Sequence, residues 1–380
     1  MAKLLSLQMV RGVAANLVVL QHLTEFEAKY ADTKLPSVAH YGDLGVDFFF
    51  VLSGFIMVAV AGRGVTPLRF LWRRAARIYP TYWLATLIMI AAAVFLPHVV
   101  HEQLSSIPLW RSFLLVAASP QQPVVSVGWT LVHEVYFYLV FAIFLAIRIP
   151  FIFGAMVWAA IIILARIVSP AELMNSSPVL EMATSPLTFE FMLGLVIGVL
   201  WIERQPPQIL VNVGVVAPIV LAVALLPIIA VHFYLFAHEV PVVGIIPFGD
   251  DVYALVCRVL MFGIPIAVLL YSLVTYEAHV AKHVPRLFVA LGDWSYSVYL
   301  FHFMLLSALG RAVLWAFPEH GMAAAITLFV AGFAAVNLAG SAVYVLFERP
   351  TLGWLHRLGS AIRRAGKPIE SIEVEQIPIR

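Results

Sequence analysis

Charged residues are scarce in this chain, because Asp, Glu, Lys and Arg together make up only 12% of its 380 residues. A soluble domain carries about 25% charged residues, so the composition argues against a water-soluble globular protein. The net charge of +2 is too small to indicate nucleic-acid binding. The single cysteine, Cys257, excludes an intramolecular disulfide and argues against a metal site built on thiolates. We therefore expect no metal and no nucleic-acid partner.

Long apolar runs take the place of the missing charge, since 62% of the residues are hydrophobic. A run of about 18 or more apolar residues can cross a bilayer as a helix. The runs predict an all-α, polytopic integral membrane protein with about ten transmembrane helices, and the shorter stretch 106–117 predicts an interfacial or re-entrant helix. The expected spans are 5–24, 43–62, 78–97, 128–147, 151–168, 185–202, 209–230, 252–275, 291–316 and 322–347.

Basic residues are distributed unevenly over the segments between these runs. If the N-terminus is cytoplasmic, most Lys and Arg residues in the loops and the tail fall in the cytoplasm. The exceptions outside it are Lys29, Lys34 and Arg111. This asymmetry predicts that both termini are cytoplasmic. We divide the chain into a membrane domain, 1–348, and a basic cytoplasmic tail, 349–380, which we expect to be flexible.

Two ionisable residues, Arg11 and His22, interrupt the first apolar run. Eleven residues make about three helical turns, so both side chains lie on one face, about 16 Å apart along the axis. An ionisable group inside a membrane is costly and indicates a function. Glu25 follows on a neighbouring part of that face, and a carboxylate beside an imidazole makes a suitable general base. The alternative is that His22 only caps the end of the helix.

An arginine-rich segment, RFLWRRAARIYPTYW, precedes the third span. Arg69, Arg73 and Arg77 recur every four residues on one helical face, and Arg74 lies beside it. Arginine side chains bind phosphates bidentately, although arginines next to a span also bind anionic lipid and set topology. The cluster is denser than topology requires, so we favour a phosphate-bearing ligand. We expect Pro80 to start the span.

The second span contains two polar side chains at membrane depth, Asp47 and Ser53. A buried aspartate is costly unless it has a partner. Ser53 with Gly54 is more typical of close helix packing. Val51 excludes a nucleophile elbow, because that motif requires glycine two residues before the serine.

The fourth span begins GWTLVHEVYFYLVF and places a carboxylate, Glu134, about one turn inside the membrane. Thr130, Glu134 and Tyr138 are spaced four residues apart and share one helical face. An intramembrane carboxylate should face the interior of the bundle. Trp129 fits the aromatic belt at the membrane surface.

The ninth span, GDWSYSVYLFHF, begins with Asp293 and Ser295, which we expect to cap the helix. His302 lies deeper, and it either contacts the substrate or makes a helix-to-helix hydrogen bond. At the end of the last span, Pro350 is expected to stop the helix and Glu348 to close a cytoplasmic ion pair.

Taken in order, the Arg11–His22 helix and the segments GVDFFFVLSGF, RRAARIYPTYW, GWTLVHEVYFY and GDWSYSVYLFH resemble the membrane acyltransferase-3 family, from about residue 5 to residue 350. The opening SLQMVRGVAANLVVLQH most resembles the branch that O-acetylates bacterial exopolysaccharides and Nod-factor-like glycans. The resemblance implies a ten-helix protein of the bacterial inner membrane that transfers an acyl group from cytoplasmic acyl-CoA to a glycan hydroxyl.

The family's motifs can be placed on this sequence. By motif match they fall on Arg11 and His22, on Arg74 and Arg77 for R-x-x-R, and on Trp129 to Glu134 for W-S-L-x-x-E. Thr130 replaces the serine of that last motif. Val135 stands where many members carry a second glutamate, so a role for paired glutamates does not transfer.

These features predict an O-acyltransferase that uses acetyl-CoA and acts on a glycan or a lipid-linked oligosaccharide, in contact with membrane lipids and with polysaccharide biosynthesis machinery. Acyl transfer requires a base for the acceptor hydroxyl. We assign the base to His22, assisted by Glu25 or by Glu134 facing the same cavity. We expect acyl-CoA to bind Arg11, Arg73, Arg74 and Arg77, and we place in a substrate-binding or structural role Asp47, Ser53, Trp129, Tyr138 and His302.

Two other functions remain open from the residues alone. The same polar groups could form the pathway of a glycolipid transporter or flippase, or the chain could be a structural partner in a polysaccharide export complex. Transfer or hydrolysis of acetyl-CoA by the purified protein distinguishes the enzyme from both.

Overall fold

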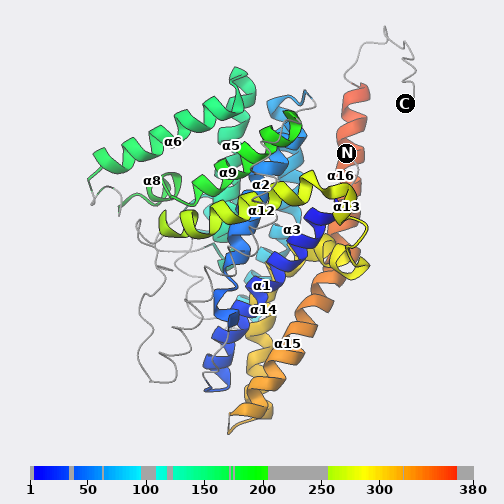
Figure 1. Ribbon diagram of the computed structural model, residues 1–380. Helices are drawn as coiled ribbons and strands as arrows, with labels where there is room; N and C mark the ends of the chain where they lie inside the picture. The colour runs from blue at the N-terminus through cyan, green and yellow to red at the C-terminus, as the bar shows by residue number, and fades with distance from the viewer. Residues whose placement is uncertain are drawn as a thin grey trace.

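Helices form all of the regular structure in the part of the chain that the computed structural model describes, namely residues 4–33, 38–61, 64–95, 108–117, 123–170, 173, 176–203, 256–319 and 321–365. The cause is the apolar composition, because a backbone in a bilayer must satisfy its hydrogen bonds within the segment. The elements in Figure 1 are α1 (Leu5–Tyr30), η1 (Val38–Tyr41), α2 (Leu44–Ala61), α3 (Pro67–Phe95), α4 (Leu109–Leu114), η3 (Ser126–Gly128), α5 (Trp129–Ile147), α6 (Phe151–Val168), α8 (Pro178–Ala183), α9 (Thr188–Glu203), η4 (Val259–Gly263), α12 (Ile264–Thr275), α13 (Glu277–Val280), α14 (Arg286–Ala316), α15 (Met322–Val343), η5 (Tyr344–Glu348) and α16 (Arg349–Ala365).

Eight helical segments among the described residues are long and apolar enough to cross a membrane. They correspond to eight of the expected spans, so the all-helical, multi-pass membrane fold is confirmed. The first expected span, 5–24, lies in α1, which has 26 residues. It is not one of the eight, because Arg11, Asn16, His22 and other polar residues make it less apolar. The expected span 209–230 lies outside the described residues, and the count of ten and the orientation of the termini remain predictions.

Helices α1 and α14 run side by side and parallel near the centre of the bundle (Figure 1). A Cβ atom on Gly292 of α14 would lie 2.0 Å from the Gln8 carbonyl oxygen of α1, so the two backbones are in contact there. Further along both helices, a Cβ on Gly310 would lie 2.2 Å from the Tyr30 ring. These two close approaches fix the distance between the helices on either side of His22 and His302.

Helices α2 and α9 make a second close contact. A Cβ on Gly54 would lie 2.0 Å from the Phe191 carbonyl oxygen, and a Cβ on Gly194 would lie 1.9 Å from the Val51 carbonyl oxygen. The prediction that Gly54 serves helix packing is therefore confirmed. The neighbouring residue, Ser53, is directed to α5 instead, where it reaches Glu134.

Helix α3 begins earlier than expected and contains the arginine-rich segment together with the third span. The prediction that Pro80 starts this span is wrong, because Pro80 lies inside the helix. Membrane helices tolerate proline where neighbouring groups satisfy the freed backbone. Two residues before this proline, the Tyr296 hydroxyl donates to the Ile78 carbonyl oxygen at 2.7 Å and joins α14 to α3. The arginines are consequently held on one rigid helix rather than in a loop.

The start of α14 also differs from the expectation. The helix begins at Arg286, directly after Pro285, so Asp293 and Ser295 lie inside it and are not caps. Proline favours the beginning of a helix because it has no N–H to leave unpaired. Ser295 is fully buried and donates to the Gly292 carbonyl oxygen at 2.8 Å.

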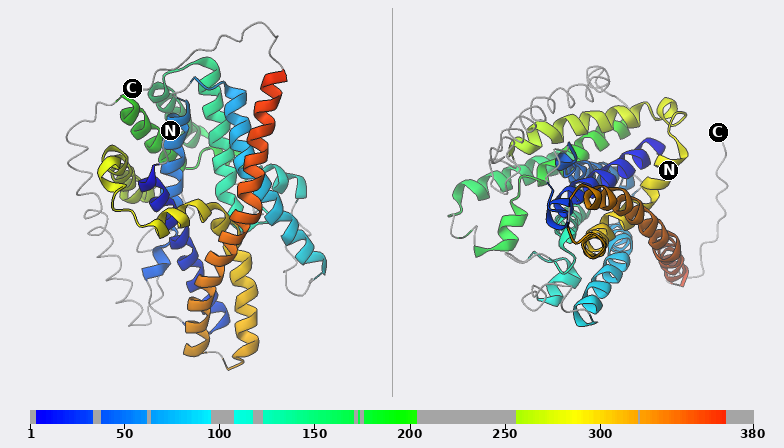
Figure 2. Two further views of the ribbon diagram at one scale, coloured as in Figure 1. Left: turned by 90° about the vertical axis from the view of Figure 1, so that its right-hand side faces the viewer. Right: turned by 90° about the horizontal axis from the view of Figure 1, so that it is seen from below.

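Helices α15 and α16, with η5 between them, form one long continuous rod (Figure 2). The prediction that Pro350 ends the helix is therefore wrong. Pro350 follows the π-helical turn η5, which departs from the regular hydrogen-bond pattern and accommodates the missing N–H. The division of the chain at residue 348 remains a prediction. The short helix expected within 106–117 is present as α4.

Candidate active site

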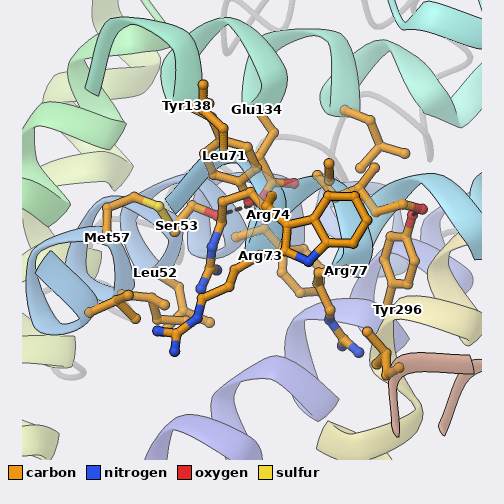
Figure 3. A pocket seen from close by; sticks show the side chains of 18 of the residues that line it. Leu52, Ser53, Met57, Leu71, Arg73, Arg74, Arg77, Glu134, Tyr138 and Tyr296 are labelled. Carbon is orange, nitrogen blue, oxygen red and sulfur yellow. Dashed lines mark hydrogen bonds between the residues drawn. The ribbon is translucent and has the colours of Figure 1, made fainter. Parts of the chain in front are cut away.

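A cavity of about 1400 Å³ lies between α2, α3, α5 and α14, with two leucines of α16 at its border (Figure 3). It exceeds the roughly 300–1,000 Å³ of most small-molecule pockets. Its lining residues on α2 run from Val46 to Val60. At about 1.5 Å per residue the cavity extends roughly 21 Å along that helix. It therefore has room for a long, extended ligand.

The cavity wall is strongly basic. The charged residues among the described residues that line it are five arginines and one glutamate: Arg11, Arg69, Arg73, Arg74, Arg77 and Glu134. Four of the arginines lie on α3, whose first turn, with Leu68 and Arg69, also lines the cavity. The amino end of a helix carries unpaired N–H groups and a positive partial charge, so it adds to the attraction for anions.

Arg77 already has an anionic partner within the protein. Its guanidinium donates to the carboxylate of Glu348, which also accepts a hydrogen bond of 2.5 Å from the Ser297 hydroxyl. The Glu348 side chain is 0% exposed, and η5 places it there. The ion pair expected for Glu348 is therefore present, with Arg77 as partner. Glu348 does not itself line the cavity, and its contact with Arg77, which does, was not apparent from the sequence.

Glu134 is held by two hydroxyl groups. Ser53 of α2 donates to its Oε1 at 2.9 Å, and the Tyr138 hydroxyl donates to the same oxygen. Arg74 completes the group, with its guanidinium carbon 5.9 Å from the centre of the Tyr138 ring (Figure 3). Thr130 lines the cavity as well, as the spacing of four residues predicts. The prediction that Thr130, Glu134 and Tyr138 share one helical face is thus confirmed, and that face lines the cavity.

Arg11 lines the cavity from α1, close enough to interact electrostatically with Arg77, Glu348, Asp293 and Glu134. His22, three turns further along α1, is not among the lining residues. Glu134 therefore lines the cavity as expected, but the expectation that the same cavity contains His22 is wrong.

His22 forms a pair with Glu25. Its Nδ1 lies 2.8 Å from the Glu25 Oε2, and the Gln21 amide donates to the other oxygen of Glu25 at 3.0 Å. The His22 side chain is 21% exposed. Because the carboxylate accepts, Nδ1 carries a proton, and in the neutral form of the ring Nε2 presents a lone pair. Of the two carboxylates considered for this role, Glu25 is the one that contacts His22.

A layer of rings separates His22 from the cavity. The His22 ring lies 5.1 Å from that of His302, and His302 lies 5.7 Å from Tyr299. Tyr299 lines the cavity, where it packs against Phe49 at 5.7 Å. The Tyr299 hydroxyl also lies 2.8 Å from the Thr130 Oγ1, which joins α14 to α5. His22 and the basic cavity are thus neighbours across Tyr299 and His302.

Asp47 has a different environment. Arg258, at the start of η4, donates to both of its oxygens, at 2.8 and 2.6 Å, and also pairs with Asp43 at 3.2 Å. Asp47 is 0% exposed and does not line the cavity. Burial raises the pKa of the Asp43 carboxyl to about 6, against the opposing effect of Arg258. Through these contacts Asp47 joins α2 to Arg258, which directly precedes η4.

Trp129 packs against the rings of Phe50 and His133, at 6.4 and 5.8 Å, and does not line the cavity. Among the described residues no group of three or more His, Cys, Asp or Glu side chains could hold a metal ion.

Comparisons with known proteins place the chain in a family. A family model described as an acyltransferase domain matches residues 4–345. The chain is 33% identical over 326 residues to the exopolysaccharide production protein ExoZ of Rhizobium meliloti (strain 1021), covering 82% of this chain and 90% of the relative. It is 26% identical over 385 residues to the acyltransferase MdmB of Streptomyces mycarofaciens, covering 93% of each. No solved structure matches the chain.

Proposed function

The chain belongs to the acyltransferase family whose model spans residues 4–345, and on this basis we propose that it transfers an acetyl group from acetyl-CoA to a hydroxyl of an exported bacterial glycan. The protein is a multi-pass membrane acyltransferase. The observation that carries the finer proposal is the basic cavity, which ends one layer of rings away from the His22–Glu25 pair.

The donor fits the cavity by its charge and length. Coenzyme A combines several phosphate charges with a long, uncharged arm, and arginines bind phosphates through charge-assisted hydrogen bonds. Arg69, Arg73 and Arg74 line the cavity from α3 and are suited to the phosphates. Arg77 lines it too and is paired with Glu348. Apolar residues of α2 line the remaining length and suit the arm. With the arginines on the cytoplasmic side, as the charge distribution predicts, the donor enters from the cytoplasm of a bacterial inner membrane.

His22 serves as the general base. Its Nε2 takes the proton of the acceptor hydroxyl while that oxygen attacks the thioester carbonyl carbon. The C–O bond forms, the C–S bond breaks, and the proton passes to the CoA thiolate. Glu25 holds the productive tautomer and stabilises the imidazolium that forms.

The relatives support a glycan acceptor. ExoZ is named for exopolysaccharide production and MdmB is named as an acyltransferase. Family membership favours an enzyme over the glycolipid transporter and over the structural partner considered from the sequence. We accordingly place the protein with the machinery that builds an exported polysaccharide.

Substitution His22→Ala tests the proposal. Removing a general base lowers the rate by about 10²- to 10⁴-fold, while the half-buried position allows the protein to fold. The assay measures transfer of labelled acetyl from acetyl-CoA to de-O-acetylated oligosaccharides of the host polysaccharide, with thermal unfolding as the control for folding. Wild-type transfer by the His22→Ala protein would contradict the assignment of the base, and absence of transfer by the native protein would contradict the function.

A further inference from the structure

His302 on α14 has one ring nitrogen with a partner and one without. The residue is 0% exposed, and its Nδ1 lies 2.5 Å from the carbonyl oxygen of Tyr299. A carbonyl oxygen only accepts hydrogen bonds, so Nδ1 is the donor and carries a proton. The other nitrogen, Nε2, is buried and has no hydrogen-bond partner among the described residues.

The His302 ring is neutral by the same contacts. A buried imidazolium requires an anionic partner, and the hydrogen bonds of the described residues give His302 none. A neutral ring protonated at Nδ1 presents a lone pair at Nε2. Nε2 is therefore an unused acceptor, and a buried acceptor without a donor costs free energy that a phenylalanine ring would avoid. A donor supplied by a ligand removes this cost.

The hydrogen bond of His302 does not join two helices. Its partner, Tyr299, lies three residues earlier on α14 itself. The sequence left two roles open for His302, a contact with the substrate or a helix-to-helix hydrogen bond. No helix-to-helix hydrogen bond of His302 is observed among the described residues. The ring that His302 faces on α1 is His22, with ring centres 5.1 Å apart and planes inclined by 33°. The ring that carries the unused acceptor accordingly lies beside the His22 ring.

The relative position of the two histidines is fixed. The backbones of α1 and α14 touch at Gly292, and the helices meet again where Gly310 receives the Tyr30 ring. His22 and His302 lie between these contacts. The backbone contacts thus set the relative position of the two imidazoles, whereas a ligand reaches the buried His302 Nε2 only when the groups that cover it move aside.

We propose that His302 Nε2 accepts a hydrogen bond from a second hydroxyl of the acceptor sugar, adjacent to the hydroxyl that His22 deprotonates. The inference rests on the proposed acyl transfer to a glycan. One hydroxyl has one proton and cannot donate to both imidazoles at once, so two adjacent acceptors match two adjacent hydroxyls. The acceptor is therefore a sugar unit with a free vicinal diol, and His302 selects which of the two oxygens receives the acyl group.

Two substitutions separate this role from a structural one. In His302→Asn the side-chain amide still reaches the Tyr299 carbonyl but has no acceptor at the Nε2 position. In His302→Gln the longer side chain brings an amide oxygen close to that position. We expect both proteins to unfold at the wild-type temperature.

The experiment uses the full chain in lipid nanodiscs, acetyl-CoA, and oligosaccharides from the de-O-acetylated host polysaccharide. For His302→Asn we expect kcat/KM for the oligosaccharide to fall by about 10-fold or more, an unchanged KM for acetyl-CoA, and a mixture of acetylated positions by nuclear magnetic resonance. His302→Gln should recover part of the rate and the single product.

Three results would overturn the inference. Wild-type kcat/KM with a single acetylated position in His302→Asn would show that Nε2 binds no hydroxyl. Equal loss in both variants, with a lower unfolding temperature and a raised KM for acetyl-CoA, would make His302 structural. Absence of acetyl transfer by the wild-type protein would overturn the proposed function together with this inference, whereas the first two results leave that function intact.

Discussion

The arginines of α3 should divide into two classes, and substituting them one at a time tests the division. Arg73→Gln and Arg74→Gln remove cations from the cavity wall. Arg77→Gln instead breaks the ion pair with Glu348. We expect the first two variants to lose donor affinity and the third to lose stability.

The magnitudes follow from the contacts. A hydrogen bond to a charged phosphate contributes about 1.5–3 kcal/mol, so Arg73→Gln or Arg74→Gln should weaken acetyl-CoA binding roughly 10- to 100-fold. Glu348 is 0% exposed, and among the described residues it keeps the Ser297 hydroxyl and the more distant charge of Arg11 once Arg77 is gone. Breaking a buried ion pair in this way costs about 3–5 kcal/mol of folding free energy.

The assay is a titration of the purified full chain in nanodiscs with acetyl-CoA and with 3′-dephospho-CoA, paired with thermal unfolding. Binding to the wild-type protein should weaken as salt is added, because exposed charges are screened. The control is the double substitution Arg77→Gln with Glu348→Gln, which removes both charges and should recover most of the stability lost in Arg77→Gln alone.

Wild-type affinity in both Arg73→Gln and Arg74→Gln would refute the reasoning and leave these arginines with a topological role. An unchanged unfolding temperature in Arg77→Gln would show that Glu348 does not depend on this partner.

Two further predictions concern the carboxylates. Glu134→Gln keeps an acceptor for the Ser53 and Tyr138 hydroxyls but removes the negative charge from the cavity. We therefore expect most acetyl transfer to be lost at an unchanged unfolding temperature. Normal transfer with a lowered unfolding temperature would make Glu134 purely structural. Asp47→Asn weakens the contact with Arg258, while Asp43 still balances the charge of Arg258. We therefore expect a loss of about 1.5–3 kcal/mol of stability and an unchanged kcat per folded molecule. A reduced kcat in stable protein would instead place Asp47 in the reaction.

Local patterns in the sequence were sufficient to predict where most of the helices lie. An apolar run of spanning length has few alternatives in a bilayer, and α6 occupies the expected residues 151–168. The face shared by Thr130, Glu134 and Tyr138 follows from the helical repeat and lines the cavity. The His22–Glu25 contact also lies within one turn and was expected from spacing. Proline was the misleading signal, because Pro80 and Pro350 lie within helical structure that their surroundings support.

Only the tertiary structure decided which distant residues meet. Arg77 pairs with Glu348, Arg258 with Asp47, and His22 faces His302, in each case across more than 200 residues of sequence. A helical repeat fixes which residues share a face, but it leaves open which helix lies opposite that face and at what height. Backbone contacts such as the one at Gly292 set that height. The sequence therefore determined the membrane fold and the individual polar residues, whereas helix packing determined that Arg77 pairs with Glu348, that Asp47 pairs with Arg258, and that His302 lies beside His22.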